Sequence, residues 1–171
     1  DPFAGRGTAI FSAATNDRIG MGVELNPVGW VYSKAKLNAA PKEDVIERLK
    51  EIGRLAARRT AKPRLPVFFS WCFSQRVQRF LMTARKHLNW RRDKVDWTLT
   101  ALLLVNMHGK RESSLSNQMR QTKSMSPDYA VNWWKKQNLR PPLVDPVEFM
   151  EKRIEWRYAK GVPVTNDSFV Y

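Results

Sequence analysis

The sequence predicts an α/β fold for the first part of the chain, followed by a mostly helical, basic subdomain. One supporting observation is the order of features in residues 1–27, which read as a glycine turn, a helix, a short strand and an acidic residue. The other is the charge distribution. Residues 1–53 carry seven basic and seven acidic side chains, whereas residues 54–160 carry 23 basic and eight acidic ones. Nearly all of the net charge of +14 therefore comes from the second part.

The glycine turn is Gly5-Arg6-Gly7, and the helix is predicted over about residues 8–16, before a strand over Met21–Glu24. In a doubly wound sheet, such a turn lets the backbone approach a ligand, and the start of the helix offers free N–H donors. An acid at the end of the next strand is placed to bind ribose hydroxyls. These features favour a partial Rossmann-like domain with a nucleoside site. The alternative is an ordinary glycine turn in an α/β domain.

The complete string is more specific. Asp1-Pro2-Phe3-Ala4-Gly5-x-Gly7-Thr8, with Gly22-x-Glu24-x-Asn26-Pro27 downstream, resembles the cofactor half of the DNA methyltransferases that modify exocyclic amines. The resemblance covers roughly the first 40 residues. It implies S-adenosylmethionine as cofactor and N4-methylcytosine or N6-methyladenine as product.

The same resemblance implies a role for each residue of the motif. Asp1, Phe3, Gly5 and Gly7 would line the pocket for the methionine and adenosine parts. Glu24 would bind the ribose, with Leu25 and Asn26 beside the adenine. Arg6 departs from the usual Ser, so its side chain must point outward to avoid the sulfonium. The expected cofactor-binding set is Asp1, Pro2, Phe3, Ala4, Gly5, Gly7, Thr8, Glu24, Leu25 and Asn26.

Composition excludes several classes of protein. The 171 residues suffice for one domain or slightly more, and 43% of them are hydrophobic, which is typical of a globular chain. One cysteine and two histidines leave no disulfide framework, and we expect no metal site. The longest apolar run, residues 102–105, is too short to cross a bilayer, and no signal peptide opens the chain. We therefore expect no membrane association and a cytoplasmic location.

The remaining elements are predicted mainly as helices. Asn26 is a good N-cap with Pro27 at the first helical position, and that helix should end near Asn38. Residues 42–59 show the clearest amphipathic pattern. The apolar run Val67–Phe73 fits either a buried strand or a packed loop. Further helices are predicted from Gln75 with Ser74 as cap, from Asp93 to His108-Gly109, from Ser126-Pro127, and from Asp145-Pro146 through Tyr158 to Gly161.

These patterns divide the chain into three parts. Residues 1–62 are the expected S-adenosylmethionine-binding part of the Rossmann-like domain. Residues 63–162 are the expected basic helical region that recognises the DNA target. Residues 163–171 read as the start of the next strand of the sheet.

Two features of the basic region suggest contacts with DNA. Residues 110–126 are polar, basic and amide-rich, with little to bury, and their side chains could read base edges or hold phosphates. A mobile surface loop is the alternative. Trp133 and Trp134, beside two lysines, could stack on an extruded base, although such a pair more often belongs to the core.

The family's catalytic tetrapeptide, Asp/Asn/Ser-Pro-Pro-Tyr/Phe, is absent. Ser126-Pro127-Asp128-Tyr129 comes closest, but it lies within a helical pattern and is interpreted as a helix start. No catalytic residue is therefore assigned. Both ends of the sequence suggest a fragment of a longer enzyme, or half of a split one whose other half would be its partner.

The leading hypothesis is the cofactor-binding and DNA-recognition portion of an amino-group DNA methyltransferase that acts on double-stranded DNA. An RNA methyltransferase with a basic helical extension is a second hypothesis. A third is a non-enzymatic, basic nucleic-acid-binding module. Cytosine or adenine as target, the recognition sequence and a restriction partner stay open.

Overall fold

The computed structural model describes residues 1–61, 64–120, 125–163, 165 and 168–171. Of these residues 57% are helical and 2% lie in strands, and their sheet has two parallel strands. The predicted Rossmann-like α/β fold is therefore wrong. A doubly wound sheet needs several apolar strands covered on both faces. Here the apolar runs at Val67–Cys72 and at residues 99–105 form helices instead.

The chain forms two compact units that interleave in sequence. The first unit contains Asp1–Arg48, Leu88–Leu102 and Ile154–Tyr171, and the second contains Leu49–His87 and Leu103–Arg153. Three helices contribute residues to both units: α3 (Lys42–Ala57), α6 (Lys94–Met107) and α8 (Pro146–Tyr158). The linear division expected at residues 62–63 falls outside the described residues.

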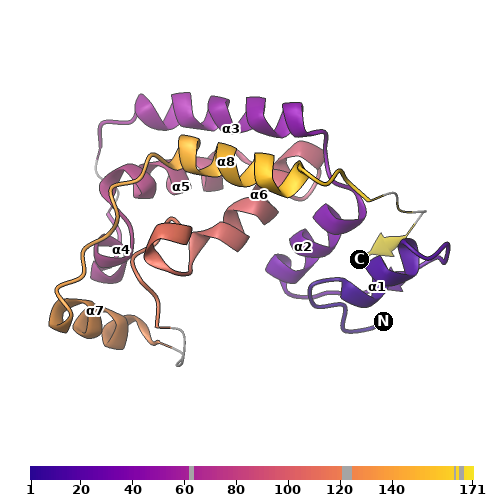
Figure 1. Ribbon diagram of the computed structural model, residues 1–171, viewed down its shortest axis with the longest axis horizontal. Helices are drawn as coiled ribbons and strands as arrows, with labels where there is room; N and C mark the ends of the chain where they lie inside the picture. The colour runs from indigo at the N-terminus through magenta and orange to yellow at the C-terminus, as the bar shows by residue number, and fades with distance from the viewer. Residues whose placement is uncertain (62–63, 121–124, 164, 166–167) are drawn as a thin grey trace. The chain divides into compact units, whose positions relative to one another are not determined.

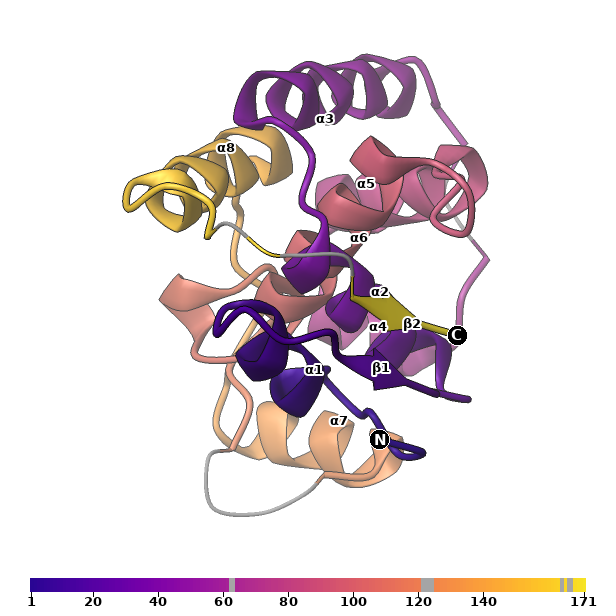
Figure 2. The same cartoon turned by 90° about the vertical axis from the view of Figure 1, so that its right-hand side faces the viewer.

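The first unit holds the glycine turn. Its own elements are α1 (Thr8–Ala14), β1 (Met21–Gly22), α2 (Pro27–Leu37) and β2 (Phe169–Val170). Strand β2 lies parallel to β1, with Met21 opposite Phe169, and Figure 2 shows the two strands side by side. The strand expected at the end of the chain is thus confirmed for these residues. Residues 164, 166 and 167 of that expected segment are not among the described ones.

The N-terminal segment runs along the other edge of β1. The Ala4 amide donates to the Val23 carbonyl at 2.9 Å, and the Val23 amide donates to the Asp1 carbonyl at 2.9 Å. A small apolar cluster fastens this ladder to the first two helices. Its buried members are Ala4, Ile10, Ala14, Leu37 and Val170.

In its described residues, the regular secondary structure of the second unit consists of helices (Figure 1). Its own elements are α4 (Val67–Cys72), α5 (Gln75–His87), the short 3₁₀ helix η1 (Arg111–Ser113) and α7 (Pro127–Lys136). Helices α4 and α7 pack together, and the rings of Phe68 and Trp134 lie 5.6 Å apart between centroids. The largest fully buried side chains of this unit are Leu49, Ile52, Val77, Phe80, Leu115, Trp134 and Met150.

The predicted helix starts are confirmed by their capping contacts. Asn26 Oδ1 accepts the Val28 amide at 2.9 Å at the start of α2. Ser126 Oγ accepts the Tyr129 amide at 3.4 Å at the start of α7. Each bond satisfies one of the backbone donors that a helix start leaves free. By contrast, the predicted strand or loop at Val67–Phe73 is helix α4, which begins after Pro66 and ends where Phe73 becomes extended.

Candidate functional site

The glycine turn has the backbone that its sequence predicts. Gly5 and Gly7 have φ values of +55° and +68°, a left-handed conformation that favours glycine. The Gly7 amide donates to the Ala4 carbonyl at 2.8 Å, which closes the turn. Helix α2 lies directly behind it, because a Cβ on Gly7 would come within 2.5 Å of Ser33 Oγ.

The Glu24 carboxylate joins the turn to the start of α2. One of its oxygens accepts the Gly5 amide, and the other accepts the Asn26 amide at 2.7 Å. Asn26 in turn caps α2 through the Val28 amide. The structure therefore brings together Gly5, Glu24 and Asn26, three residues of the expected cofactor set that lie up to 21 positions apart.

The carboxylate keeps capacity for a ligand. A carboxylate offers about four acceptor positions, two on each oxygen. Each Glu24 oxygen uses one of them for a backbone amide. Within the described residues two positions are left, which matches the two hydroxyls of a ribose.

Two large apolar residues of the expected cofactor set, one before Glu24 in the sequence and one after it, are exposed to solvent. Phe3 is 87% exposed and Leu25 is 94% exposed, although both are side chains that proteins usually cover. Pro2 is exposed as well. Ala4 differs, since it is 6% exposed and packs in the core beside Val170.

Two more residues of the expected set make polar contacts. Asp1 Oδ1 accepts the Phe3 amide at 3.0 Å and so holds the first turn of the chain. Thr8 Oγ1 accepts a hydrogen bond from Lys36 Nζ at 3.3 Å. Burial lowers the pKa of Lys36, and the charges of Arg6 and Arg157 lower it further.

Arg6 is exposed, as its departure from the family pattern requires. Its guanidinium carbon lies 4.6 Å from the centroid of the Tyr32 ring. Partial burial raises the pKa of Tyr32, and the positive charge of Arg6 opposes that rise. The arginine is thereby stacked on α2.

Sequence reasoning missed two residues of this site, Ser33 and Gly29. Ser33 is fully buried, and its hydroxyl donates to the Gly5 carbonyl at 3.4 Å. A Cβ on Gly29 would lie 2.5 Å from the Gly5 carbonyl oxygen and 2.9 Å from Glu24 Cγ. Gly29 and Ser33 follow Asn26 by about one and two helical turns, so both lie on the inner face of α2. A small and a polar residue on that face were the signal by which the sequence could have identified them.

The second unit carries the positive charge. Its sequence contains 19 Lys and Arg against six Asp and Glu, a net charge of +13, whereas the first unit has 11 and ten, a net charge of +1. Six carboxylates cannot neutralise 19 cations, so the second unit keeps a large positive net charge. The charge asymmetry seen along the sequence is therefore also an asymmetry between the two units.

The expectation that residues 110–126 have little to bury is wrong for Ser114–Asn117. All four residues are buried, with Leu115, Ser116 and Asn117 at 0% exposure. The Asn117 amide group donates to the carbonyls of Trp71 at 3.0 Å and Leu139 at 3.3 Å. These contacts leave Asn117 unable to reach a base edge. Residues 121–124 lie outside the described part of the chain.

Trp134 belongs to the core, which was the favoured of its two predictions. It is 0% exposed, and its Nε1 donates to the Gln118 carbonyl at 2.6 Å. Trp133 is half-buried. Ser126-Pro127-Asp128-Tyr129 is confirmed as a helix start, so it offers no catalytic tetrapeptide.

Cys72 and His108 form a close but uncharged pair. Cys72 Sγ lies 3.9 Å from His108 Nδ1. Burial raises the pKa of the thiol to about 12, and desolvation lowers the pKa of His108, although this ring retains an exposed side. Both groups are neutral near pH 7, so the thiolate that a nucleophilic cysteine needs is absent.

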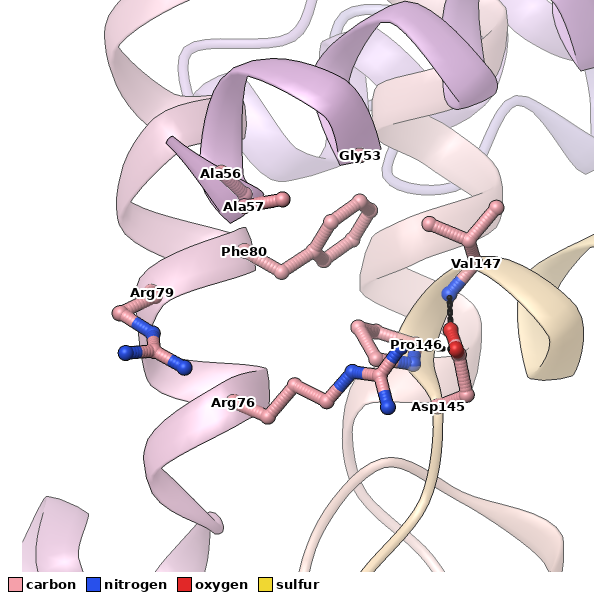
Figure 3. Close-up of a pocket in the computed structure, with 9 residues that line it drawn as sticks. All are labelled: Gly53, Ala56, Ala57, Arg76, Arg79, Phe80, Asp145, Pro146 and Val147. Atoms are coloured by element: carbon pink, nitrogen blue, oxygen red, sulfur yellow. Dashed lines mark hydrogen bonds and ion pairs between the residues drawn. The ribbon is translucent and has the colours of Figure 1, made fainter. Parts of the chain in front are cut away.

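A small cavity of about 240 Å³ lies between α3, α5 and the start of α8 in the second unit. Figure 3 shows Arg76 reaching from α5 toward Asp145, with the Phe80 ring turned into the cavity. Arg76 forms an ion pair with Asp145, and Asp145 Oδ1 also accepts the Val147 amide at 2.9 Å. One of the two arginines that line the cavity, Arg76, is thus neutralised by Asp145.

The residues that the structure describes contain no group of three or more His, Cys, Asp or Glu side chains able to hold a metal ion. Within the same described ranges, no helix is both long and apolar enough to cross a membrane.

Comparison with known proteins gives no relative. No protein-family model, no curated protein and no solved structure matches the chain.

Proposed function

We propose that this chain is the cofactor-binding and DNA-recognition portion of an S-adenosylmethionine-dependent amino-group DNA methyltransferase. The first unit would hold the cofactor and the basic second unit would contact double-stranded DNA. The residues that grip the target amine would come from outside the printed sequence, which lacks the catalytic tetrapeptide.

One observation carries this proposal. The Glu24 carboxylate is held by backbone amides from the glycine turn and from the α2 cap, and it keeps two free acceptor positions. An ionised acceptor fixed in this way is pre-organised for two hydroxyl donors. The exposed rings and alkyl groups of Phe3 and Leu25 supply apolar surface for a purine.

The bound cofactor would supply an electrophilic methyl group for direct transfer to a base amine. The residues of this chain would bind and orient. Glu24 would accept hydrogen bonds from the ribose, and the Gly5–Gly7 turn would let the ligand approach the backbone without a side chain in the way. No proton transfer is assigned to any residue of the chain.

Glu24→Gln tests the proposal, with Glu47→Gln as matched control. Glu47 is an exposed carboxylate of the same unit, so the control removes the same charge. Titration calorimetry with S-adenosylmethionine should show affinity reduced at least about tenfold in the first variant, or about 1.4 kcal/mol. Affinity for a short DNA duplex should stay unchanged in both variants. No detectable cofactor binding by the unmodified chain, or equal binding by Glu24→Gln, would overturn the cofactor assignment.

A second candidate function is a non-enzymatic nucleic-acid-binding module. The net charge of +13 on one unit and the mostly helical fold favour it. This candidate predicts salt-sensitive DNA binding, while S-adenosylmethionine leaves the melting temperature unchanged.

A further inference from the structure

The second unit contains an open groove that the cofactor site does not involve. It encloses about 520 Å³ and is lined by six residues from the start of α5, the start of η1 and the segment that follows α7. The lining residues are Ser74, Gln75, Arg111, Arg140, Pro141 and Leu143.

The charge of this groove is uncompensated by its own lining. Two of the six residues are arginines, and none is acidic. Arg111 and Arg140 are both exposed, and in the described part of the chain neither forms an ion pair. Two guanidinium groups that line one hollow repel each other, and an anion between them would turn that repulsion into attraction. The cavity of Figure 3 differs, because there Asp145 already neutralises Arg76.

Arg140 is held in place before any ligand arrives. Its guanidinium carbon lies 4.5 Å from the centroid of the Trp71 ring, and Lys135 Nζ lies 5.8 Å from the same ring. Pro141 and Pro142 follow, so the backbone beyond the arginine is restricted. A stacked, planar guanidinium keeps its edge N–H groups free for paired hydrogen bonds with oxyanions such as phosphate.

The remaining lining favours a ligand that is partly polar and stays near the surface. Ser74 and Gln75 bring a hydroxyl and an amide to the start of α5, while Leu143 is 95% exposed at the rim. An open groove with two arginines suits a phosphodiester that remains attached to a larger molecule.

We propose that this groove binds the phosphate backbone of double-stranded DNA, with Arg111 and Arg140 as its two cationic contacts. This inference rests on the DNA-binding role proposed for the second unit and goes further by assigning the contact to one groove. The rest of the positive surface would then act through long-range attraction alone.

The test compares two double variants that remove equal charge. Arg111→Gln/Arg140→Gln empties the groove of cations. Arg85→Gln/Lys86→Gln removes two exposed cations from the last turn of α5, outside the groove. Fluorescence anisotropy with a short labelled duplex, repeated over a series of NaCl concentrations, gives the affinity and its salt dependence.

The groove variant should bind DNA at least about tenfold more weakly. The slope of its plot of log K against log salt concentration should become shallower by about 1 to 2. The control variant should lose less than about threefold in affinity. Arg111→Gln alone, with its exposed neighbour Lys110→Gln as control, gives the same comparison if the double variant fails to fold.

Each other outcome has a definite meaning. Equal weakening by the groove and control variants would overturn the groove assignment and leave DNA binding as a diffuse surface property. Preferential displacement of the DNA by an RNA duplex of equal length would overturn the choice of DNA. Absence of duplex binding by the unmodified chain would instead contradict the proposed DNA-recognition function, and cofactor binding measured separately would be unaffected.

Discussion

The side-chain amide of Asn117 donates a hydrogen bond of 3.0 Å to the main-chain carbonyl of Trp71. The backbone amide of Asn117 also donates to the Cys72 carbonyl at 2.6 Å, and its Oδ1 accepts the Gln118 amide at 2.8 Å. One buried side chain thus satisfies carbonyls at the end of α4 and beyond α7. Ser114–Asn117 therefore belongs to the internal structure of the second unit.

Replacing Asn117 should destabilise the protein without a specific effect on DNA binding. Asn117→Ala leaves buried carbonyls unsatisfied and should cost about 2–3 kcal/mol of unfolding free energy. Asn117→Asp sets a carboxylate against those carbonyls and should cost more. Urea denaturation measures both, with exposed Asn132→Ala as control. Weaker duplex binding by a fully folded Asn117→Ala variant would argue that this segment reads DNA after all.

Alanine at Gly7 should destabilise the glycine turn more than alanine at Gly5. Both glycines have positive φ, so each alanine costs about 1–2 kcal/mol of backbone strain. A Cβ on Gly7 would in addition meet Ser33 Oγ at 2.5 Å, whereas the nearest atom to a Cβ on Gly5 is 4.0 Å away. The free energy of unfolding, measured by thermal denaturation, should therefore be at least about 1 kcal/mol lower for Gly7→Ala than for Gly5→Ala. Equal losses would mean that α2 does not press on the turn.

Local signals in the sequence predicted local structure well. Asn26, Ser74, Ser126 and Asp145 each mark a helix start, because a short polar side chain can accept a free backbone amide within the same turn. The Gly5–Gly7 turn is another local feature, since both residues have positive φ, which glycine adopts without strain.

Predictions that depended on distant partners fared less well. Val67–Cys72 is apolar except for Ser70, so its period could not distinguish helix from strand, and its packing against α7 decides for helix. Ser114–Asn117 is polar, and only the carbonyls of Trp71 and Leu139, distant in sequence, explain its burial. The Rossmann-like sheet was predicted from one turn and one strand. It does not form because apolar segments that could have supplied further strands, such as Val67–Cys72, are helices.

The groove at Arg111 and Arg140 could not be read from spacing, since 29 positions separate the two arginines. The charge excess after residue 53 pointed to the region. The stacking of Arg140 on Trp71 depends on the packing of α4 and could not be foreseen.

Cys72 should be unreactive in the native protein. It is 0% exposed, and burial raises the pKa of its thiol to about 12. A thiol-specific reagent at pH 8 should label the unfolded chain completely and the native chain very slowly, since the thiolate is the reactive form. Rapid labelling under native conditions would show that α4 opens readily.

The same thiol should make stability fall at high pH. Between the ordinary pKa of 9.0 and about 12, the unfolded chain loses a proton that the native chain retains. The unfolded state is then favoured, by up to about 1.4 kcal/mol per pH unit from this group. Below pH 9 the contribution vanishes. Cys72→Ala should remove this part of the slope when urea unfolding is compared at pH 8 and pH 10, and an identical slope in both proteins would contradict the assignment.

Arg48 and Asp96 form a largely buried ion pair that should be important for the stability of the first unit. Asp96 Oδ1 accepts Arg48 Nε at 2.8 Å, and its other oxygen accepts the Asn89 amide at 2.6 Å. The Asp96 side chain is 6% exposed and that of Arg48 is 22% exposed. By contrast, the Lys152–Glu148 pair joins two side chains that are 71% and 67% exposed.

Asp96→Ala should therefore cost about 3–5 kcal/mol of unfolding free energy, because it removes the charge opposite a largely buried guanidinium and the acceptor of the Asn89 amide. Glu148→Gln should cost less than about 0.5 kcal/mol, since exposed pairs are screened by water. The double variant Arg48→Met/Asp96→Ala should lose less than the sum of its single variants, as it leaves neither member of this pair without the other. Urea unfolding of the unmodified protein, the two single variants Asp96→Ala and Arg48→Met, and the double variant measures the coupling free energy directly. If Asp96→Ala and Arg48→Met proved additive, the two side chains would act independently, and the stability of this region would have to come from its apolar contacts alone.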